Sequence, residues 1–372
     1  MSEELKACEA ISHSSIKVIK RSDRSWKTWS LHALLRVFRR HLGRPISKRP
    51  KGSNRLKPPA SVRRKCTITE RKVEDIWVYD FALKDKTKCY KYEERKERAR
   101  RQRIYYFAGG GWQMPPDSSH WKFLAALLGE LPHGATISLV SYPLAPRSPA
   151  PITFPQLMRL YDTELARAAA EDEIVTLMGD SSGGEIVLCL PLEALTRDPS
   201  TTLKPHSILA ICPSVDLSRA NPVLKEVQKS DPILKVNFVT NTAKGWAGDW
   251  DLEDPRISPL FSEHLDELAN AGVRVDGCTA GSDILGPDGV LFRTKLARLG
   301  VKGEWLQWEK MMHVWPLVKT YGISPEADEA FIWIADLLRR RGEEGVVDRK
   351  VLGDGEEEGS GRSEDVGGKE KV

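Results

Sequence analysis

Short β-branched or apolar runs alternate with longer amphipathic segments from about Thr67 to Arg340, and this alternation constrains the fold more than any other feature. A strand followed by a helix returns to the same end of the sheet, so successive strands pair in parallel. The sequence therefore predicts an α/β fold, with a mostly parallel central sheet and helices on both of its faces. The predicted strands are 76–81, 103–107, 136–141, 174–178, 207–212, 273–279 and 304–308. The predicted helices are 121–131, 155–170, 183–196, 290–299 and 326–340.

Composition divides the chain into three regions. Residues 67–342 form the α/β domain, and within them residues 217–254 break the alternation with prolines and tryptophans, so we expect an insertion over the rim of the sheet there. Residues 1–66 are basic, since 18 of the 57 Lys and Arg residues of the chain lie in 1–65. Residues 343–372 are acidic and hold seven glycines, and we expect this tail to be disordered.

Residues 26–42 predict a basic amphipathic helix. Its apolar side carries Trp26, Trp29, Ala33, Leu34, Val37 and Phe38, and the narrower basic arc carries His32, Arg36, Arg39 and Arg40. Three interpretations are open: the apolar side docks on the core of this chain as a lid, it makes peripheral contact with an anionic membrane, or the segment is disordered. Residues 43–65 are rich in Pro, Gly, Lys and Arg and predict an exposed linker. No aromatic-interleaved recognition motif accompanies this charge, so we expect no nucleic-acid binding.

The six cysteines are scattered without a C-x-x-C pair, which favours free thiols in a reducing compartment. The opening residues MSEELKACEA lack the features of a secretory signal, and no stretch approaches 18 consecutive apolar residues. We therefore expect an intracellular protein that is not secreted, either cytoplasmic or peripherally associated with a membrane such as the endoplasmic reticulum. No motif indicates a metal or a cofactor, and we expect neither.

The most informative motif is Gly-Asp-Ser-Ser-Gly-Gly at residues 179–184. It follows the apolar run IVTLM and precedes the helical pattern IVLCLPLEAL, which is the strand, turn and helix context of a nucleophile elbow. Such a turn strains the central serine, and its neighbours at positions −2 and +2 must lack side chains so that strand and helix can approach closely. Ser181, between Gly179 and Gly183, is therefore the candidate nucleophile.

A nucleophilic serine needs a base, and in this context the acid and the histidine follow later in the chain. Of the eight histidines, only His313 lies beyond the last strand-end carboxylates, after the run EWLQWEKMM. The segment VRVDGCTAGSDILGPDG offers Asp283 directly after a predicted strand and Asp288 five residues later. We favour Asp283 as the partner of His313 and interpret Asp288 as a helix-entry residue that complements the helix dipole.

The glycine run at 109–111 follows the predicted strand RIYYF and can expose backbone amides. Acyl transfer needs such donors, aimed at the oxygen of the tetrahedral intermediate. We expect an oxyanion hole made by amides of this loop together with that of Ser182.

Five ordered motifs now resemble those of the hormone-sensitive-lipase-like branch of the α/β hydrolases, and within it fungal steryl acetyl hydrolase-like esterases. They are Ala108-Gly-Gly-Gly-Trp112, Tyr142-Pro-Leu-Ala-Pro146, GDSSGG, Asp283-Ile-Leu and His313-Val-Trp, and the resemblance runs from about Trp77 to Arg340. It implies an α/β-hydrolase fold with a helical cap, built by residues before about 75 and by 217–254. It also implies a triad and an oxyanion hole at Ser181, Asp283, His313, Gly110, Gly111 and Ser182.

Ala108 departs from the family, which has a histidine at this position of the loop. Side-chain contacts that steady the loop must therefore come from elsewhere, although the backbone donors survive. Plant gibberellin receptors share the fold and these motifs but lack the triad histidine and only bind their ligand, whereas this chain retains His313.

These features predict a serine carboxylesterase that hydrolyses a short-chain, acetyl-like ester of a hydrophobic molecule through an acyl-enzyme. Four aromatic residues are candidates for lining its pocket: Trp112, Phe238, Trp246 and Trp250. Acyl transfer to an alcohol, or a tailoring hydrolysis in fungal secondary metabolism, would use the same serine. A ligand receptor without turnover is the alternative from another class.

Overall fold

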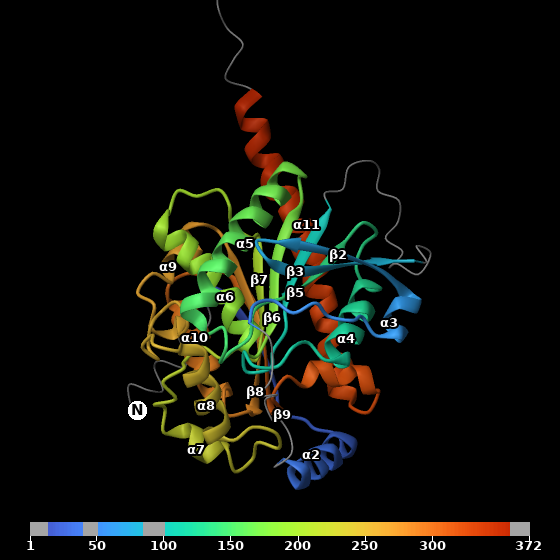
Figure 1. Ribbon diagram of the computed structural model, residues 1–372, viewed down its shortest axis with the longest axis vertical. Helices are drawn as coiled ribbons and strands as arrows, with labels where there is room; N and C mark the ends of the chain where they lie inside the picture. The colour runs from blue at the N-terminus through green and yellow to red at the C-terminus, as the bar shows by residue number, and fades with distance from the viewer. Residues whose placement is uncertain (1–13, 40–50, 85–100, 358–372) are drawn as a thin grey trace, which may run out of the picture.

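The computed structural model describes residues 14–39, 51–84 and 101–357, and its centre is a nine-stranded sheet (Figure 1). The strand order is β1-β9-β8-β7-β6-β4-β5-β3-β2. The strands are β1 (Ile16–Arg21), β2 (Cys66–Val73), β3 (Ile76–Leu83), β4 (Gln102–Phe107), β5 (Thr136–Ser141), β6 (Ile174–Asp180), β7 (Ser207–Ile211), β8 (Arg274–Ser282) and β9 (Gly303–Met312). Only β3 runs against its neighbours, so the predicted mostly parallel sheet is confirmed.

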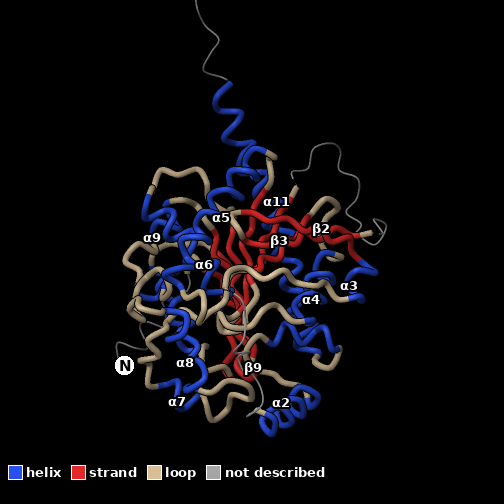
Figure 2. Tube along the Cα trace, viewed as in Figure 1, coloured by secondary structure: helices blue, strands red, loops and turns tan. Residues whose placement is uncertain are grey.

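Helices cover both faces of this sheet (Figure 2). α5 (Ala150–Ala170), α6 (Ser182–Arg197) and α10 (Gly286–Arg298) pack on one face, and α4 (Ser118–Leu128) and α11 (Pro325–Glu357) pack on the other. Each face of the sheet has its own hydrophobic core, the first under α5, α6 and α10 and the second under α4 and α11. Side chains of β4 point alternately to the two faces, so Tyr105 and Phe107 belong to the first core while Ile104 and Tyr106 belong to the second.

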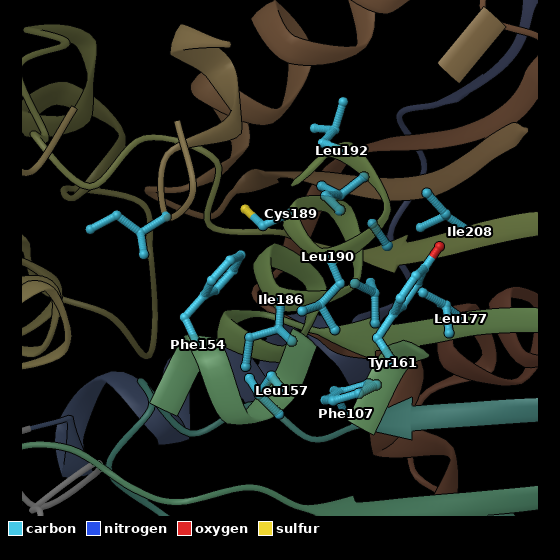
Figure 3. Close-up of a cluster of buried hydrophobic side chains, with 14 of the residues drawn as sticks. Phe107, Phe154, Leu157, Tyr161, Leu177, Ile186, Cys189, Leu190, Leu192 and Ile208 are labelled. Carbon is cyan, nitrogen blue, oxygen red and sulfur yellow. The ribbon is translucent and has the colours of Figure 1, made fainter. Parts of the chain in front are cut away.

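The first core lies between α5, α6 and the sheet (Figure 3). Leu157 and Tyr161 of α5 meet Ile186 and Leu190 of α6 over Phe107, and all five side chains are buried. This packing holds α6, whose first turn contains the last three residues of the GDSSGG motif, against the strands that carry the site.

The remaining elements are short and flank the sheet. They are α2 (Trp26–Phe38), α3 (Ala60–Lys65), α7 (Val223–Val227), α8 (Val236–Ala247), η3 (Pro259–Phe261), α9 (Asp266–Asn270) and η4 (Trp315–Tyr321). α7 and α8 fall within the predicted insertion 217–254 and carry it to the end of the molecule where α2 also lies (Figure 1). None of the helices in the described residues is long and apolar enough to cross a bilayer.

Two edge strands were not predicted: β1 lies in the region 1–66 that we had expected to hold only a helix and a linker, and β2 begins at the last residue of that region. β1 extends the sheet in parallel beside β9, and β2 pairs antiparallel with β3 along its whole length. Much of the predicted exposed linker is packed as well, because the Ser53 hydroxyl donates to the Ser141 carbonyl and the Leu56 amide donates to the Tyr79 hydroxyl. Long-range hydrogen bonds to the sheet order this basic segment, which local composition does not reveal.

The two ends of the chain also depart from the expectations. α11 continues to Glu357, so residues 343–357 of the predicted disordered tail are helical, and 358–372 lie outside the described residues. The predicted helix 26–42 is α2, which ends at Phe38, and Arg40 with the rest of 40–50 lies outside the described residues. Trp26, Trp29, Leu34 and Val37 of the predicted apolar side face solvent, and α2 packs on the second core through Leu31 and Leu35 instead.

Candidate active site

The GDSSGG motif forms a sharp turn between β6 and α6. Ser181 has φ 54° and ψ −118°, a strained conformation for a residue with a side chain. A Cβ atom at Gly183 would lie 1.9 Å from the Phe107 carbonyl oxygen, and one at Gly179 would lie 2.4 Å from the Gly183 oxygen. Both positions therefore require glycine, as the sequence predicted, and the turn presents the Ser181 hydroxyl at the carboxyl edge of the sheet.

A chain of two hydrogen bonds links Ser181 to residues that follow β9 and β8. The Ser181 Oγ lies 2.8 Å from Nε2 of His313, and Nδ1 of His313 lies 2.8 Å from Oδ2 of Asp283. The other Asp283 oxygen accepts from the Leu285 amide at 2.9 Å. The serine is thus positioned to give its proton to a neutral imidazole, whose Nδ1–H points to the carboxylate.

The electrostatic surroundings favour the charged form of His313. Burial alone would lower its pKa, but the charge and hydrogen bond of Asp283 outweigh this and raise the pKa above its ordinary value of 6.5. Asp231 adds negative charge and is itself held by the amides of Ile233 and Ile284. Burial, followed by the charge of Asp283, raises the pKa of Asp231 to about 6.

Asp288, the other carboxylate considered from sequence, has a different partner. It lies in the first turn of α10, and its Oδ1 accepts a hydrogen bond of 2.6 Å from the Asn221 side chain. Burial raises the pKa of Asp288 to about 6. The structure therefore brings Asp283, rather than Asp288, to His313.

The glycine loop after β4 exposes amides toward the same space. Gly110 and Gly111 have φ of 132° and 58°, which glycine adopts without strain. In the part of the chain that the structure describes, neither amide donates to a protein acceptor. Ser182 is the first residue of α6, where the amide lies outside the helical hydrogen-bond ladder. All three predicted oxyanion residues line one cavity with Ser181.

The structure shows what steadies this loop in place of the histidine that Ala108 replaces. Asp180, beside the nucleophile position, accepts from the Gly109 amide at 2.9 Å and from the Tyr106 hydroxyl at 2.5 Å. His120 of α4 lies between Asp180 and Asp117, at 3.4 Å and 2.9 Å from their carboxylates. Although burial opposes it, these carboxylates raise the pKa of His120 to about 10, so the imidazole is protonated at neutral pH.

The Tyr-Pro-Leu-Ala-Pro motif after β5 supports the same loop from its other side. The Tyr142 hydroxyl donates to the Ala108 carbonyl at 2.8 Å, and the Ala145 amide donates to the Trp112 carbonyl at 2.9 Å. The motif is visible in the sequence, but these contacts are not. Asp180 and His120 were likewise missed as supporting residues, although Asp180 stands within GDSSGG.

A cavity of about 380 Å³ opens beside Ser181. Trp112 and Phe238, two of the four predicted aromatic residues, line it. Trp246 does not, because its ring stacks behind that of Trp112, at 5.9 Å between ring centroids. Trp250 does not line it either, because its ring packs against Phe154 and under the Arg256 guanidinium. The apolar wall comes instead largely from Ile233, Leu234, Val239, Leu285, Met312, Leu317 and Val318.

Two ionisable side chains, Arg219 and Glu185, are buried in or behind this wall. Arg219 lines the cavity and donates to the Ser214 hydroxyl at 2.6 Å, and burial lowers the pKa of Arg219 to about 10. Glu185 accepts from the Trp112 indole at 2.9 Å, and burial raises the pKa of Glu185 to about 8. The Glu185 carboxyl is therefore mostly protonated at neutral pH, and it fixes the ring of Trp112.

Among the described residues, one trio of possible metal ligands stands out, formed by Cys212, Asp283 and His313 within 4.8 Å of one another. Asp283 and His313 are already engaged with each other, and burial raises the pKa of the Cys212 thiol well above its ordinary value. A metal would need the thiolate, which this site disfavours. The donor set therefore fits proton transfer better than metal binding.

Comparisons with known proteins agree with this geometry. Residues 104–317, more than half of the chain, match the alpha/beta hydrolase fold family, and the chain belongs to this family. An esterase of Acinetobacter venetianus is 28% identical over 239 residues, which cover 63% of this chain and 74% of that protein. Human hormone-sensitive lipase is 28% identical over 159 residues, which cover 41% of this chain and 14% of the lipase.

A solved structure extends the likeness of fold over most of the chain. Carboxyl esterase 2 from the mycorrhizal fungus Tuber melanosporum superimposes with a TM-score of 0.68 at 19% identity, covering 86% of this chain and 99% of that one. The predicted α/β-hydrolase fold and the resemblance to hormone-sensitive lipase are confirmed.

Proposed function

We propose that the chain is a serine carboxylesterase that hydrolyses a short-chain, acetyl-like ester of a hydrophobic molecule. Its family and relatives make it a carboxylic ester hydrolase. What we add to this class is the nucleophile, the acyl-enzyme and the kind of ester. The observation that carries the proposal is the hydrogen-bonded chain Ser181–His313–Asp283 at the wall of an apolar cavity.

In the proposed reaction, Ser181 Oγ attacks the ester carbonyl while His313 Nε2 takes the hydroxyl proton. The amides of Gly110, Gly111 and Ser182 stabilise the negative oxygen of the tetrahedral intermediate. His313 returns the proton to the departing alcohol, which leaves an acyl-enzyme on Ser181. Water, activated by the same imidazole, then releases the acid, and Asp283 stabilises the imidazolium each time it forms.

The cavity supports an alcohol portion that is hydrophobic. Its wall is mostly aliphatic and aromatic, with Ile233, Leu234 and Phe238 contributed by the 217–254 segment. Such a wall gains from burying apolar substrate surface. The acetyl-like acyl group is proposed from the family resemblance.

The first test is hydrolysis of p-nitrophenyl acetate by the whole chain and by Ser181→Ala. We expect kcat to fall by about 10⁴-fold or more, because the variant retains the amide donors but has no nucleophile. Ser200→Ala, at an exposed turn after α6, is the matched control and should behave as the parent. Equal activity of Ser181→Ala and the parent would contradict the assignment.

Covalent labelling separates turnover from mere binding. A fluorophosphonate probe should label the parent at Ser181 and leave Ser181→Ala unlabelled, since the probe needs an activated serine. Failure to label a folded parent would favour a receptor without turnover. Transfer of the acyl group to an added alcohol, with no acid released, would overturn hydrolysis while retaining the role of Ser181.

A further inference from the structure

The helix α2 presents large apolar side chains to solvent. Trp26 is 74% exposed, Trp29 57%, Leu34 56% and Val37 73%. With Ala33, they recur at helical spacing and form one stripe, which we call the α2 outer face (Trp26, Trp29, Ala33, Leu34 and Val37). A stripe of this kind normally faces a core, so its exposure indicates an outside partner.

The polar side of α2 fixes this orientation. The Ser25 hydroxyl caps the helix by accepting from the Thr28 amide at 3.2 Å. The Thr28 hydroxyl donates to Ser324 at 2.8 Å, and Ser25 donates to Glu326 from both its amide and its hydroxyl. These bonds tie α2 to the start of α11, so the helix cannot turn its apolar stripe inward without breaking them.

The charge around this stripe is positive. Residues 24–39 contain Arg24, Lys27, Arg36 and Arg39 and no Asp or Glu. Helical spacing places Lys27 on one flank of the α2 outer face and Arg36 on the other, and both are exposed. Exposed tryptophans between basic flanks are the pattern of a helix that lies in the headgroup layer of an anionic membrane.

The same helix contacts two segments that contribute residues to the wall of the cavity beside Ser181. Arg36 donates to the Ser230 carbonyl at 2.6 Å, three residues before Ile233 of the cavity wall. On its other side, Ser324 contacts α2 three residues after Tyr321, which also lines the cavity and is largely exposed. In Figure 1, α2 lies at the same end of the molecule as α7 and α8, opposite the far end of α11.

We propose that the α2 outer face docks on the surface of an anionic lipid bilayer, with the cavity beside it. Apolar contact and charge would act together, because the tryptophans enter the headgroup layer while Lys27 and Arg36 meet the lipid phosphates. Arrival of the hydrophobic ester from the bilayer rests on the proposed function, whereas binding of the helix to lipid does not.

The test is co-sedimentation of the full chain with vesicles of phosphatidylcholine and phosphatidylserine, and with phosphatidylcholine alone. The parent should bind the anionic vesicles more strongly, and binding should weaken as salt is raised. The double variant Trp26→Ser, Trp29→Ser should lose about tenfold or more of the partition coefficient. Lys27→Glu should lose about fivefold.

A double variant at other exposed apolar positions, Ile152→Ser with Leu291→Ser, is the matched control and should bind as the parent. All variants are also assayed with p-nitrophenyl acetate, whose turnover should not change. Equal sedimentation of the parent and the tryptophan variant would overturn the proposal. So would a dimer in lipid-free solution that the tryptophan variant abolishes, since a second copy would then cover the face. Inactivity of the parent toward esters would leave the binding result intact.

Discussion

The carboxyl edge of the sheet and the helix α2 use the same kinds of side chain in opposite ways. At this edge, Trp112 is fully buried and the polar partners of Ser181 are enclosed with it, and Trp305 is fully buried nearer the start of β9. At α2, Trp26 and Trp29 face solvent while Thr28 and His32 are buried. The apolar stripe predicts that a helix forms. Which side of it faces inward is decided by long-range contacts, namely the hydrogen bonds of Ser25 and Thr28 together with the packing of Leu31 and Leu35 on the second core.

The buried histidines of the two regions show the same contrast. Burial, together with Arg24 and Arg36, lowers the pKa of His32 to about 4. At the carboxyl edge of the sheet, Asp283 raises the pKa of His313 in spite of similar burial. A carboxylate at hydrogen-bond distance therefore separates a histidine whose charged form is favoured from one whose neutral form is favoured.

The largest expected effect is a loss of kcat at the carboxyl edge of the sheet. Asp283→Asn should lower kcat for p-nitrophenyl acetate by about 10⁴-fold, because the amide no longer holds the imidazole in the required tautomer or stabilises its charged form. Asp288→Asn, which changes the carboxylate bonded to Asn221, should change kcat far less. Steady-state kinetics checks both, and a larger loss in Asp288→Asn would reverse the choice between the two acids.

Replacing a tryptophan should lower the free energy of unfolding far more in the sheet than in α2. Trp305→Ala removes a fully buried ring whose indole donates to Thr279 at 3.1 Å, and should cost about 3–5 kcal/mol. Trp26→Ala removes an exposed ring and should stay within about 0.5 kcal/mol of the parent. Urea unfolding measures both values. A large loss in Trp26→Ala would show that the α2 outer face is covered by the rest of the chain.

Removing the charge of His120 should lower kcat more than it changes KM. His120→Gln removes the cation between Asp117 and Asp180, so the Gly109 loop should shift and kcat should fall by up to about 10²-fold with little change in KM. Exposed His133→Gln is the control.

His120 should also make stability depend on pH. Its folded pKa of about 10 lies above the ordinary 6.5, so its contribution is complete below pH 6.5 and is lost as pH rises through 10. The free energy of unfolding should fall less over this range in His120→Gln than in the parent. Identical pH curves for the two proteins would show that His120 is not charged in the folded state.

The smallest expected effect is a shift in the pH profile of activity. His313 must be neutral to accept the serine proton, and its pKa is raised, so kcat/KM should rise with pH to a midpoint above 6.5. His32→Gln, in the other region, should leave this midpoint unchanged. A midpoint below 6.5 in the parent would contradict the stabilising role of Asp283.

The spacing of residue types along the chain determined much of the predicted fold and of the candidate site. The seven strands and five helices predicted for the α/β domain, and the helix predicted at 26–42, were identified because period-two and helical patterns belong to contiguous residues. Gly179 and Gly183 were identified because the turn brings their backbones into direct contact with neighbouring backbone. The order of Ser181, Asp283 and His313 along strand ends likewise predicted which side chains meet.

Only the tertiary structure decided the rest, because it depends on contacts between residues far apart in the chain. Pairing with β9 makes a strand of residues 16–21, and stacking behind Trp112 removes Trp246 from the cavity. His120 becomes a support for the Gly109 loop only where α4 meets Asp180. Glu326, about 300 residues after Ser25, accepts a hydrogen bond from the polar side of α2. The apolar stripe, which the sequence could place on a helix, is therefore left facing outward.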